Sequence, residues 1–308
     1  MKIVFLEPLG LSVDKIEREC DNIKKLGHEV VIYNDKCPEK NIERAIDADI
    51  VVESNMPLRK DFFDACPNLK MLSIAFTGLD HIDLKECEER GVLVNNAAGY
   101  STEAVAEEVI CMMIGLYRDV IENDKITRSC KGTAILPGRE IANKTVGIVG
   151  LGAIGQRIAK IVQVFGCKVI AWNRSHKEMD GVCLVDKETL FRESDIISIN
   201  VALNDETRNF VSAKELSMMK STAIIINAAR GPVVNANDIA NALKNGKISG
   251  AALDVYDTEP PLSEDNPLLS APNTMLLPHI GFATEEAFEL RLKIVVKNIE
   301  NYLYSNKI

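Results

Sequence analysis

The sequence predicts an α/β protein built from two doubly wound, parallel-sheet domains. Its 308 residues exceed what a single hydrophobic core usually serves. Short β-branched runs alternate with amphipathic stretches along most of the chain, which is typical of strands joined by crossover helices. A composition of 46% hydrophobic and 26% charged residues is that of an ordinary globular protein.

The first hundred residues contain five strand-like runs separated by helical patterns, and this alternation indicates one parallel sheet. The runs are residues 3–6, 29–33, 50–53, 71–75 and 92–95. Ligands bind at the carboxyl ends of strands in open α/β sheets. The loop at Thr77 and Gly78, directly after the fourth run, is therefore a candidate ligand contact.

Residues 101–118 predict a capped, amphipathic helix that leaves the first domain. Six further strand-like runs follow, at residues 145–150, 168–172, 196–200, 223–227, 249–253 and 274–277. Residues 283–304 lack Gly and Pro and predict a terminal helix that returns to the first domain. We therefore expect one domain formed by residues 1–98 plus 285–308 and a second formed by residues 99–284.

Composition and charge exclude several classes of partner. The net charge is −9 and the basic residues are scattered, so no basic stripe is available for nucleic acid. No apolar run approaches the ~20 residues needed to span a bilayer, and the N-terminus lacks a signal-peptide cleavage site. The eight cysteines lack CxxC spacing, which favours reduced thiols over a metal site. We expect a soluble, cytoplasmic protein without membrane contact or a bound metal.

A glycine-rich turn follows the strand-like run at residues 145–150. Gly150, Gly152 and Gly155 form a GxGxxG motif between this strand and a helix that begins near Ala153 and Ile154. In the Rossmann dinucleotide-binding fingerprint, these glycines permit the tight turn, the approach of a pyrophosphate and close helix–strand packing. The alternative is a tight turn without a nucleotide, but the agreement of strand, helix and spacing favours a dinucleotide.

The end of the next strand bears on the choice of cofactor. Asn173 stands where NAD-binding proteins usually place an acidic residue for the ribose 2′-hydroxyl. Without that carboxylate a 2′-phosphate is not repelled, and Arg174, Ser175 and Lys177 can donate hydrogen bonds to it. This pattern favours NADP over NAD. The alternative is that Asn173 bonds the ribose of NAD while the basic residues are solvated.

Three later segments place polar residues at predicted strand ends of the second domain. They contain Arg230, the pair Asp254 and Glu259, and His279. Hydride transfer to a 2-oxo acid needs a cation for the carboxylate, a proton donor for the alkoxide, and a group that keeps this donor charged. Arg, His and Glu can fill these roles, although spacing alone also allows a structural Arg230–Glu259 ion pair.

Together with the fingerprint and residues 99–107, these segments resemble the D-isomer-specific 2-hydroxyacid dehydrogenase family, from about residue 50 to 285. The resemblance implies a flavodoxin-like substrate domain and a Rossmann dinucleotide-binding domain. It implies that Arg230 binds the carboxylate and carbonyl of the substrate, and that His279 donates the proton in reduction. It further implies that Glu259 pairs with His279 and fixes its tautomer.

The resemblance also assigns secondary contacts. Thr77 and Gly78 would belong to the loop that holds the substrate carboxylate. The residues implied to lie along the cofactor are Thr77, Ala228, Asp254, His279 and Gly281, with Asp254 facing the nicotinamide carboxamide. Residues 200–203 depart from the family pattern, which leaves the local cofactor contacts open. His81 is either structural or adjacent to the substrate. A homodimer through the cofactor domain is implied, with the helix at residues 101–118 near its interface.

The expected function is reduction of a small 2-oxo acid, such as glyoxylate or hydroxypyruvate, with NADP favoured over NAD. One alternative is an NAD-dependent D-3-phosphoglycerate dehydrogenase, which the Asn173-Arg174 pair disfavours. A second alternative, of another class, is a dinucleotide-sensing corepressor on the same fold. The natural substrate stays open at this point.

Overall fold

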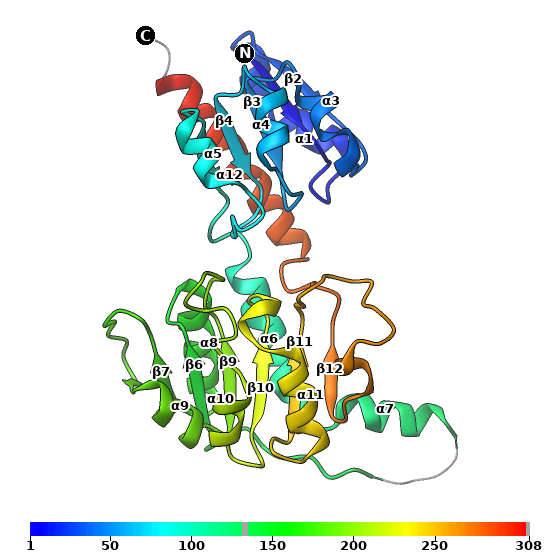
Figure 1. Ribbon diagram of the computed structural model, residues 1–308, viewed down its shortest axis with the longest axis vertical. Helices are drawn as coiled ribbons and strands as arrows, with labels where there is room; N and C mark the ends of the chain where they lie inside the picture. The colour runs from blue at the N-terminus through cyan, green and yellow to red at the C-terminus, as the bar shows by residue number, and fades with distance from the viewer. Residues whose placement is uncertain (131–134, 306–308) are drawn as a thin grey trace. The chain divides into compact units, whose positions relative to one another are not determined.

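A computed structural model describes residues 1–130 and 135–305 (Figure 1). Residues 131–134 and 306–308, which fall within the ranges expected for the two domains, lie outside the described residues. The chain divides into two compact units. The first unit joins residues 1–101 to the segment that begins at Ala283, and the second unit runs from Thr102 to Phe282.

The first unit contains a five-stranded parallel sheet in the order β2-β1-β3-β4-β5, which is the flavodoxin-like order. Its strands are β1 (Lys2–Phe5), β2 (Glu29–Ile32), β3 (Ile50–Glu53), β4 (Met71–Ile74) and β5 (Leu93–Asn96). Strands β3 and β4 are buried along their whole length, which explains their almost continuous apolar sequence. The helices are α1 (Val13–Glu19), α2 (Asp21–Lys25), α3 (Asn41–Ala45), α4 (Lys60–Ala65), α5 (Leu84–Glu89) and α12 (Glu285–Ser305).

Helix α12 completes the first unit, although it comes from the far end of the sequence. It packs against β4 and α1, and Val295 and Ile299 on its inner face are fully buried. Arg291 is also buried, and its guanidinium donates to the carbonyl oxygens of Ala75 and Leu9. The terminal segment therefore ties together loops that follow β4 and β1.

The second unit contains a seven-stranded parallel sheet in the order β12-β11-β10-β9-β6-β7-β8. This is the Rossmann order with one further strand at the β12 edge. The strands are β6 (Thr145–Val149), β7 (Lys168–Trp172), β8 (Val182–Leu184), β9 (Ile196–Ile199), β10 (Ile224–Asn227), β11 (Gly250–Leu253) and β12 (Thr274–Leu276). The expectation of six strands was wrong because β8 is a three-residue edge strand, too short to show a period in the sequence.

Helices cover both faces of the second sheet. One core layer packs residues of α6 (Thr102–Tyr117) and α8 (Ala153–Val164) on the strands. The opposite layer uses α9 (Lys187–Glu193), α10 (Ala213–Met218) and α11 (Ala236–Lys244). A further helix, α7 (Val120–Arg128), has no buried residue. Because all seven strands are parallel, the loops after β6, β7, β10, β11 and β12 emerge at one edge of the sheet.

Candidate active site

The glycine motif forms a tight turn at the carboxyl end of β6. Gly150 has a φ of 96°, and its N–H donates to the carbonyl oxygen of Trp172 at 2.8 Å. A Cβ at Gly155 would clash with the carbonyl oxygen of Gly150, so α8 packs directly on the turn. Both positions therefore require glycine, as the fingerprint predicts.

Gly152 occupies the position before the first residue of α8. Unlike Gly150 and Gly155, it has free space where a side chain would lie. A Cβ at Gly152 would meet no atom within 4 Å, so open space lies in front of the helix. The N–H groups at the start of α8, near Ala153 and Ile154, lack helical partners and carry the positive end of the helix dipole. This arrangement fits the pyrophosphate of a dinucleotide.

Asn173, after β7, has its side chain engaged within the protein. Its Oδ1 accepts the N–H of Leu151 at 3.0 Å, and its Nδ2 donates to the carbonyl oxygen of Ser175 at 2.8 Å. Asn173 thus links the glycine turn to the basic loop that follows. Arg174 is exposed, and its Nη1 lies 3.6 Å from Oε2 of Glu206. Glu206, which the sequence did not mark as part of the site, therefore lies beside Arg174, the candidate partner of a 2′-phosphate.

Arg230 follows β10, and Asn227 shapes the turn that carries it. The Nδ2 of Asn227 donates to the carbonyl oxygen of Arg230 at 2.9 Å, and its Oδ1 accepts the N–H of Ala229 at 3.1 Å. The guanidinium of Arg230 donates to the carbonyl oxygen of Ala229 at 2.8 Å. Asn227 is 1% exposed, so this turn, with Ala228 at its start, is anchored from inside the sheet.

His279 and Glu259 lie together on the loops after β12 and β11. Nδ1 of His279 is 3.2 Å from Oε1 of Glu259, with the two side chains 19% and 46% exposed. His279 has a φ of 58°, a left-handed conformation that non-glycine residues adopt at a cost. Such a backbone at a candidate catalytic residue must be held by its surroundings.

The three segments interlock through Tyr256. Its single O–H is shared between the carbonyl oxygens of Leu253 and Leu277, at 3.0 and 2.9 Å, and so bridges the ends of β11 and β12. A Cβ at Gly231 would clash with the backbone of Tyr256. The turn that carries Arg230 is thereby packed against the segment that carries Glu259.

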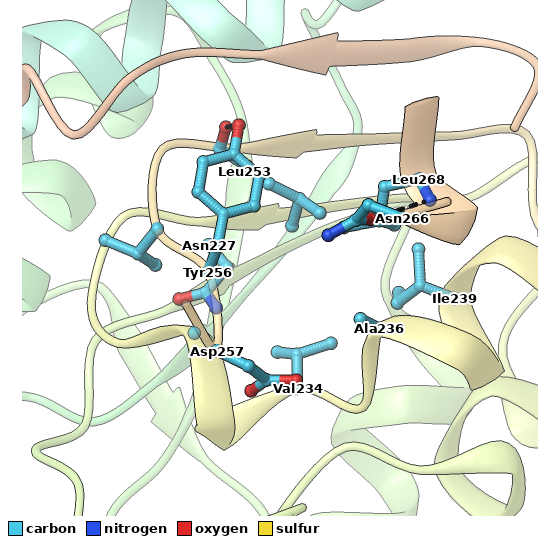
Figure 2. Close-up of a pocket in the computed structure, with 11 residues that line it drawn as sticks. Asn227, Val234, Ala236, Ile239, Leu253, Tyr256, Asp257, Asn266 and Leu268 are labelled. Atoms are coloured by element: carbon cyan, nitrogen blue, oxygen red, sulfur yellow. Dashed lines mark hydrogen bonds between the residues drawn. The ribbon is translucent and has the colours of Figure 1, made fainter. Parts of the chain in front are cut away.

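A small cavity lies behind these turns (Figure 2). Its walls are largely apolar, and four polar side chains line it, those of Asn227, Tyr256, Asp257 and Asn266. Asn227 and Tyr256 bond the backbone as described, and Oδ1 of Asn266 accepts the N–H of Leu268 at 3.0 Å. Because three of these four groups already bond the backbone and most of the lining is apolar, we regard the cavity as packing space rather than as a ligand site.

Asp254 holds the turn that follows His279. Its Oδ1 and Oδ2 accept the N–H groups of Ile280 and Gly281, both at 2.8 Å, and the residue is 1% exposed. Glu108 of α6 lies against the same turn, because a Cβ at Gly281 would clash with its Oε2. The expected contact of Asp254 with the nicotinamide stays a prediction, since the described partners of its carboxylate are these two N–H groups.

Sequence reasoning missed Glu108, although a signal was present. Ala104 and Met112, four residues before and after it on α6, are both buried. A residue at that spacing lies on the same face of the helix as these two buried residues, so an acidic residue there was a candidate for burial. Burial and the neighbouring charge of Asp254 raise the pKa of Glu108 to about 8, and burial also raises the pKa of Asp254.

The remaining candidates lie in the first unit, after β4. Thr77 is exposed and Gly78 half-buried. The side chain of Asn96 donates to the carbonyl oxygen of Thr77 at 2.7 Å and fixes the start of the loop. At the other end of the loop, Nε2 of His81 lies 2.8 Å from Oε1 of Glu53, which is fully buried. His81 therefore has a structural partner.

Two other kinds of feature are absent from residues 1–130 and 135–305. No helix there is long and apolar enough to cross a membrane. In the same part of the chain, no three or more His, Cys, Asp or Glu side chains gather in a way that could hold a metal ion.

Comparisons with known proteins agree with this geometry. Residues 110–281 match the family described as D-isomer specific 2-hydroxyacid dehydrogenase, NAD binding domain. The glyoxylate reductase of Thermococcus litoralis is 37% identical over 88% of this chain and 86% of its own length. The hydroxypyruvate reductase of Blautia hydrogenotrophica is 31% identical over 100% of this chain and 98% of its own.

A solved structure is similar over almost the whole chain. The acyclic imino acid reductase Bsp5, in complex with NADPH and D-Arg, has a TM-score of 0.90 and 30% identity, and the match covers 99% of this chain and 98% of that one. The family match spans more than half of this chain and includes the glycine turn, Arg230, Glu259 and His279. The chain therefore belongs to the D-isomer-specific 2-hydroxyacid dehydrogenase family and is an NAD(P)-dependent oxidoreductase.

Proposed function

We propose that the protein reduces a small 2-oxo acid to the D-2-hydroxy acid, with glyoxylate and hydroxypyruvate as the first candidate substrates. The observation that carries this proposal is the His279–Glu259 pair, at 3.2 Å, on the sheet edge that also carries Arg230 and the glycine turn. The names of the two relatives favour these substrates over 3-phosphoglycerate and over a corepressor role.

The roles of the residues follow from their chemistry. The guanidinium fork of Arg230 can bind a carboxylate and the adjacent carbonyl in two parallel hydrogen bonds. The bound dinucleotide supplies the hydride. His279 gives a proton to the oxygen of the carbonyl as negative charge develops there, and Glu259 holds the imidazole through Nδ1 so that Nε2 faces the substrate. In the reverse reaction, oxidation of the hydroxy acid, Nε2 of His279 accepts the proton from the hydroxyl group.

The decisive experiment is initial-rate oxidation of NADPH and NADH by the purified protein. The substrate panel is glyoxylate, hydroxypyruvate, pyruvate, phenylpyruvate and phosphohydroxypyruvate, with His279→Ala as the inactive variant. His176→Ala is the matched control, because the His176 side chain is 76% exposed. Turnover that is lost in His279→Ala and kept in His176→Ala supports the proposal. If no cofactor is consumed with any substrate, the proposal is wrong.

For the cofactor we propose a preference for NADP over NAD. No carboxylate occupies position 173, and Arg174 projects into solvent beside it. Glu206 opposes this preference, because its carboxylate lies next to Arg174 and would repel a 2′-phosphate. The NADPH:NADH ratio of kcat/KM therefore depends on both residues.

We also propose a homodimer formed through the second unit. Helix α6 is largely buried within its own unit, whereas α7 contributes no buried residue and exposes Val120 and Ile121. Ile135 and Leu136, beyond α7, are exposed as well. When exposed apolar groups form a contiguous patch, they mark a surface that contacts another protein. Sedimentation equilibrium tests the proposal, since a monomer at micromolar concentration would contradict it.

The cysteines bear on where the protein works. All eight are free, with Cys111, Cys130 and Cys183 exposed. Exposed thiols persist in reducing compartments. This supports the cytoplasm as the site of action, which fractionation of the source cells would test.

A further inference from the structure

We propose that Glu108 is a positioning residue for His279. The carboxyl group of Glu108 is protonated at neutral pH, and its O–H donates a hydrogen bond to Asp254, the residue that holds the turn after His279. This inference deepens the proposed function and rests on it, because the turn matters for catalysis only if His279 is the proton donor. Glu108 belongs neither to the glycine motif nor to the three segments that resemble the family.

The geometry brings Glu108 and Asp254 to one point. Oδ2 of Asp254 accepts the N–H of Gly281 at 2.8 Å, and a Cβ on Gly281 would lie 3.1 Å from that same Oδ2. The same Cβ would clash with Oε2 of Glu108, so the two carboxyl groups converge on Gly281. Only glycine leaves room for both of them.

Glu108 needs a proton in this setting. Both of its carboxyl oxygens are buried, and within the described part of the chain neither meets an N–H or O–H donor. A buried carboxylate without donors is costly, and a second carboxylate beside it adds repulsion. A protonated Glu108 removes both costs, because its O–H donates to Asp254 and leaves one negative charge shared by the pair.

The assignment of that single charge follows from the partners of each group. Asp254 accepts two backbone N–H groups, which favour its ionised form, and its other charged neighbour is His279. Glu108 has no such donors, and burial together with the charge of Asp254 raises its pKa to about 8. The phenol of Tyr256 also faces Asp254, but its O–H bonds carbonyl oxygens instead.

The pair matters because of the backbone that it holds. His279 is in the left-handed region at a φ of 58°, and the next two N–H groups are both bound by Asp254. When Glu108 loses its proton, two buried negative charges face each other across Gly281. We infer that the turn then loosens and that the imidazole of His279 leaves its productive position.

The first test uses proton NMR of the imidazole Cε1–H groups, which report local charge without any turnover. The chain has four histidines, so the spectrum is simple and His279 can be assigned from the His279→Gln variant. In the wild type we expect the His279 resonance to show an inflection near pH 8 from the ionisation of Glu108. Glu108→Gln should lack this inflection.

Glu107→Gln is the matched control, because Glu107 is the neighbouring residue on α6 and is exposed. It should keep the inflection near pH 8. If Glu108→Gln keeps it as well, the proposal is overturned. Because no substrate is involved, this result holds whether or not the protein proves to be a 2-oxo acid reductase.

The second test compares kcat across pH. Glu108→Gln retains an N–H donor to Asp254 and cannot ionise, so its kcat should match that of the wild type within about twofold below pH 7. Above pH 8 the ratio of wild-type kcat to Glu108→Gln kcat should fall. Glu108→Leu, which keeps the volume without a donor, should lower kcat about tenfold at every pH. A ratio that does not change with pH would refute the proposal, and a wild type without activity would instead refute the proposed function.

Discussion

The carboxylate of Glu259 lies 3.2 Å from Nδ1 of His279, and in the proposed reaction this contact assigns proton transfer to the other ring nitrogen. With Nδ1 held by the carboxylate, proton exchange falls to Nε2. Glu259→Gln keeps the shape of the pair but removes its charge, so the protonated imidazole loses its counter-ion. We expect kcat for 2-oxo acid reduction to fall roughly 10- to 100-fold, less than the roughly 10²- to 10⁴-fold fall for His279→Ala.

Steady-state kinetics of the two variants check this ranking. Glu264→Gln serves as the control, because Glu264 is exposed further along the same loop. It should leave kcat unchanged. Activity of Glu259→Gln within twofold of the wild type would show that the pair has no catalytic role.

Arg230 gives a prediction about KM. Lysine keeps the positive charge but lacks the planar fork, so Arg230→Lys should lose one of two parallel hydrogen bonds to the substrate. We expect KM for the 2-oxo acid to rise roughly 10- to 100-fold while KM for the cofactor stays within about twofold. Arg192→Lys, at a side chain 63% exposed on α9, is the control. An unchanged KM for the 2-oxo acid would show that Arg230 does not bind the substrate carboxylate.

Strand positions were predictable from the sequence because parallel strands that are buried on both faces have almost continuous apolar sequences. Every expected run coincides with an observed strand to within a residue or two at each end, as for residues 50–53 and β3. Strand β8 has only three residues, Val182–Leu184, and lies at a sheet edge where burial is partial. Its sequence therefore carries no periodic signal.

The candidate site could be proposed from the sequence only where motifs mark it. Arg230, Glu259 and His279 stand in short recognisable segments, whereas Glu108 acts through a contact that joins α6 to a loop far along the chain. Glu206 likewise reaches Arg174 from another loop. Such pairings depend on three-dimensional packing, and one sequence does not reveal which helix face meets which turn.

The glycine turn allows two substitutions to be compared directly. At Gly152 an added Cβ meets nothing in the protein, so Gly152→Ala should leave the melting temperature unchanged while it obstructs the pyrophosphate. At Gly155 the Cβ clashes with the carbonyl oxygen of Gly150, so Gly155→Ala should destabilise the unit by about 1–3 kcal/mol.

Differential scanning fluorimetry and cofactor titration by fluorescence separate these effects. Gly152→Ala should raise Kd for the dinucleotide at least about tenfold, since close approach of the backbone is lost. Unaltered cofactor affinity in Gly152→Ala would mean that the pyrophosphate does not lie on this turn.

The cofactor preference is checked at two exposed residues of opposite charge. Arg174→Ala should lower kcat/KM for NADPH by roughly tenfold and leave that for NADH nearly unchanged, because only NADPH carries the 2′-phosphate. Glu206→Gln removes the repulsion beside Arg174 and should raise kcat/KM for NADPH. If Arg174→Ala lowers kcat/KM equally for NADPH and NADH, Arg174 does not recognise the 2′-phosphate. The preference for NADP then loses its support.

The pH dependence of stability provides a last, independent prediction for Glu108. Its pKa is raised from the ordinary glutamate value of 4.5 to about 8 in the folded protein, so the folded state holds a proton that the unfolded state releases. The resulting stabilisation is fully present below pH 4.5 and is lost as the pH rises through about 8. The melting temperature of the wild type should therefore fall across this range relative to that of Glu108→Gln, which cannot ionise at this position. Glu107→Gln should follow the wild type. If the melting temperatures of the wild type and Glu108→Gln change in parallel from pH 5 to pH 9, Glu108 does not hold the proton that the pairing with Asp254 requires.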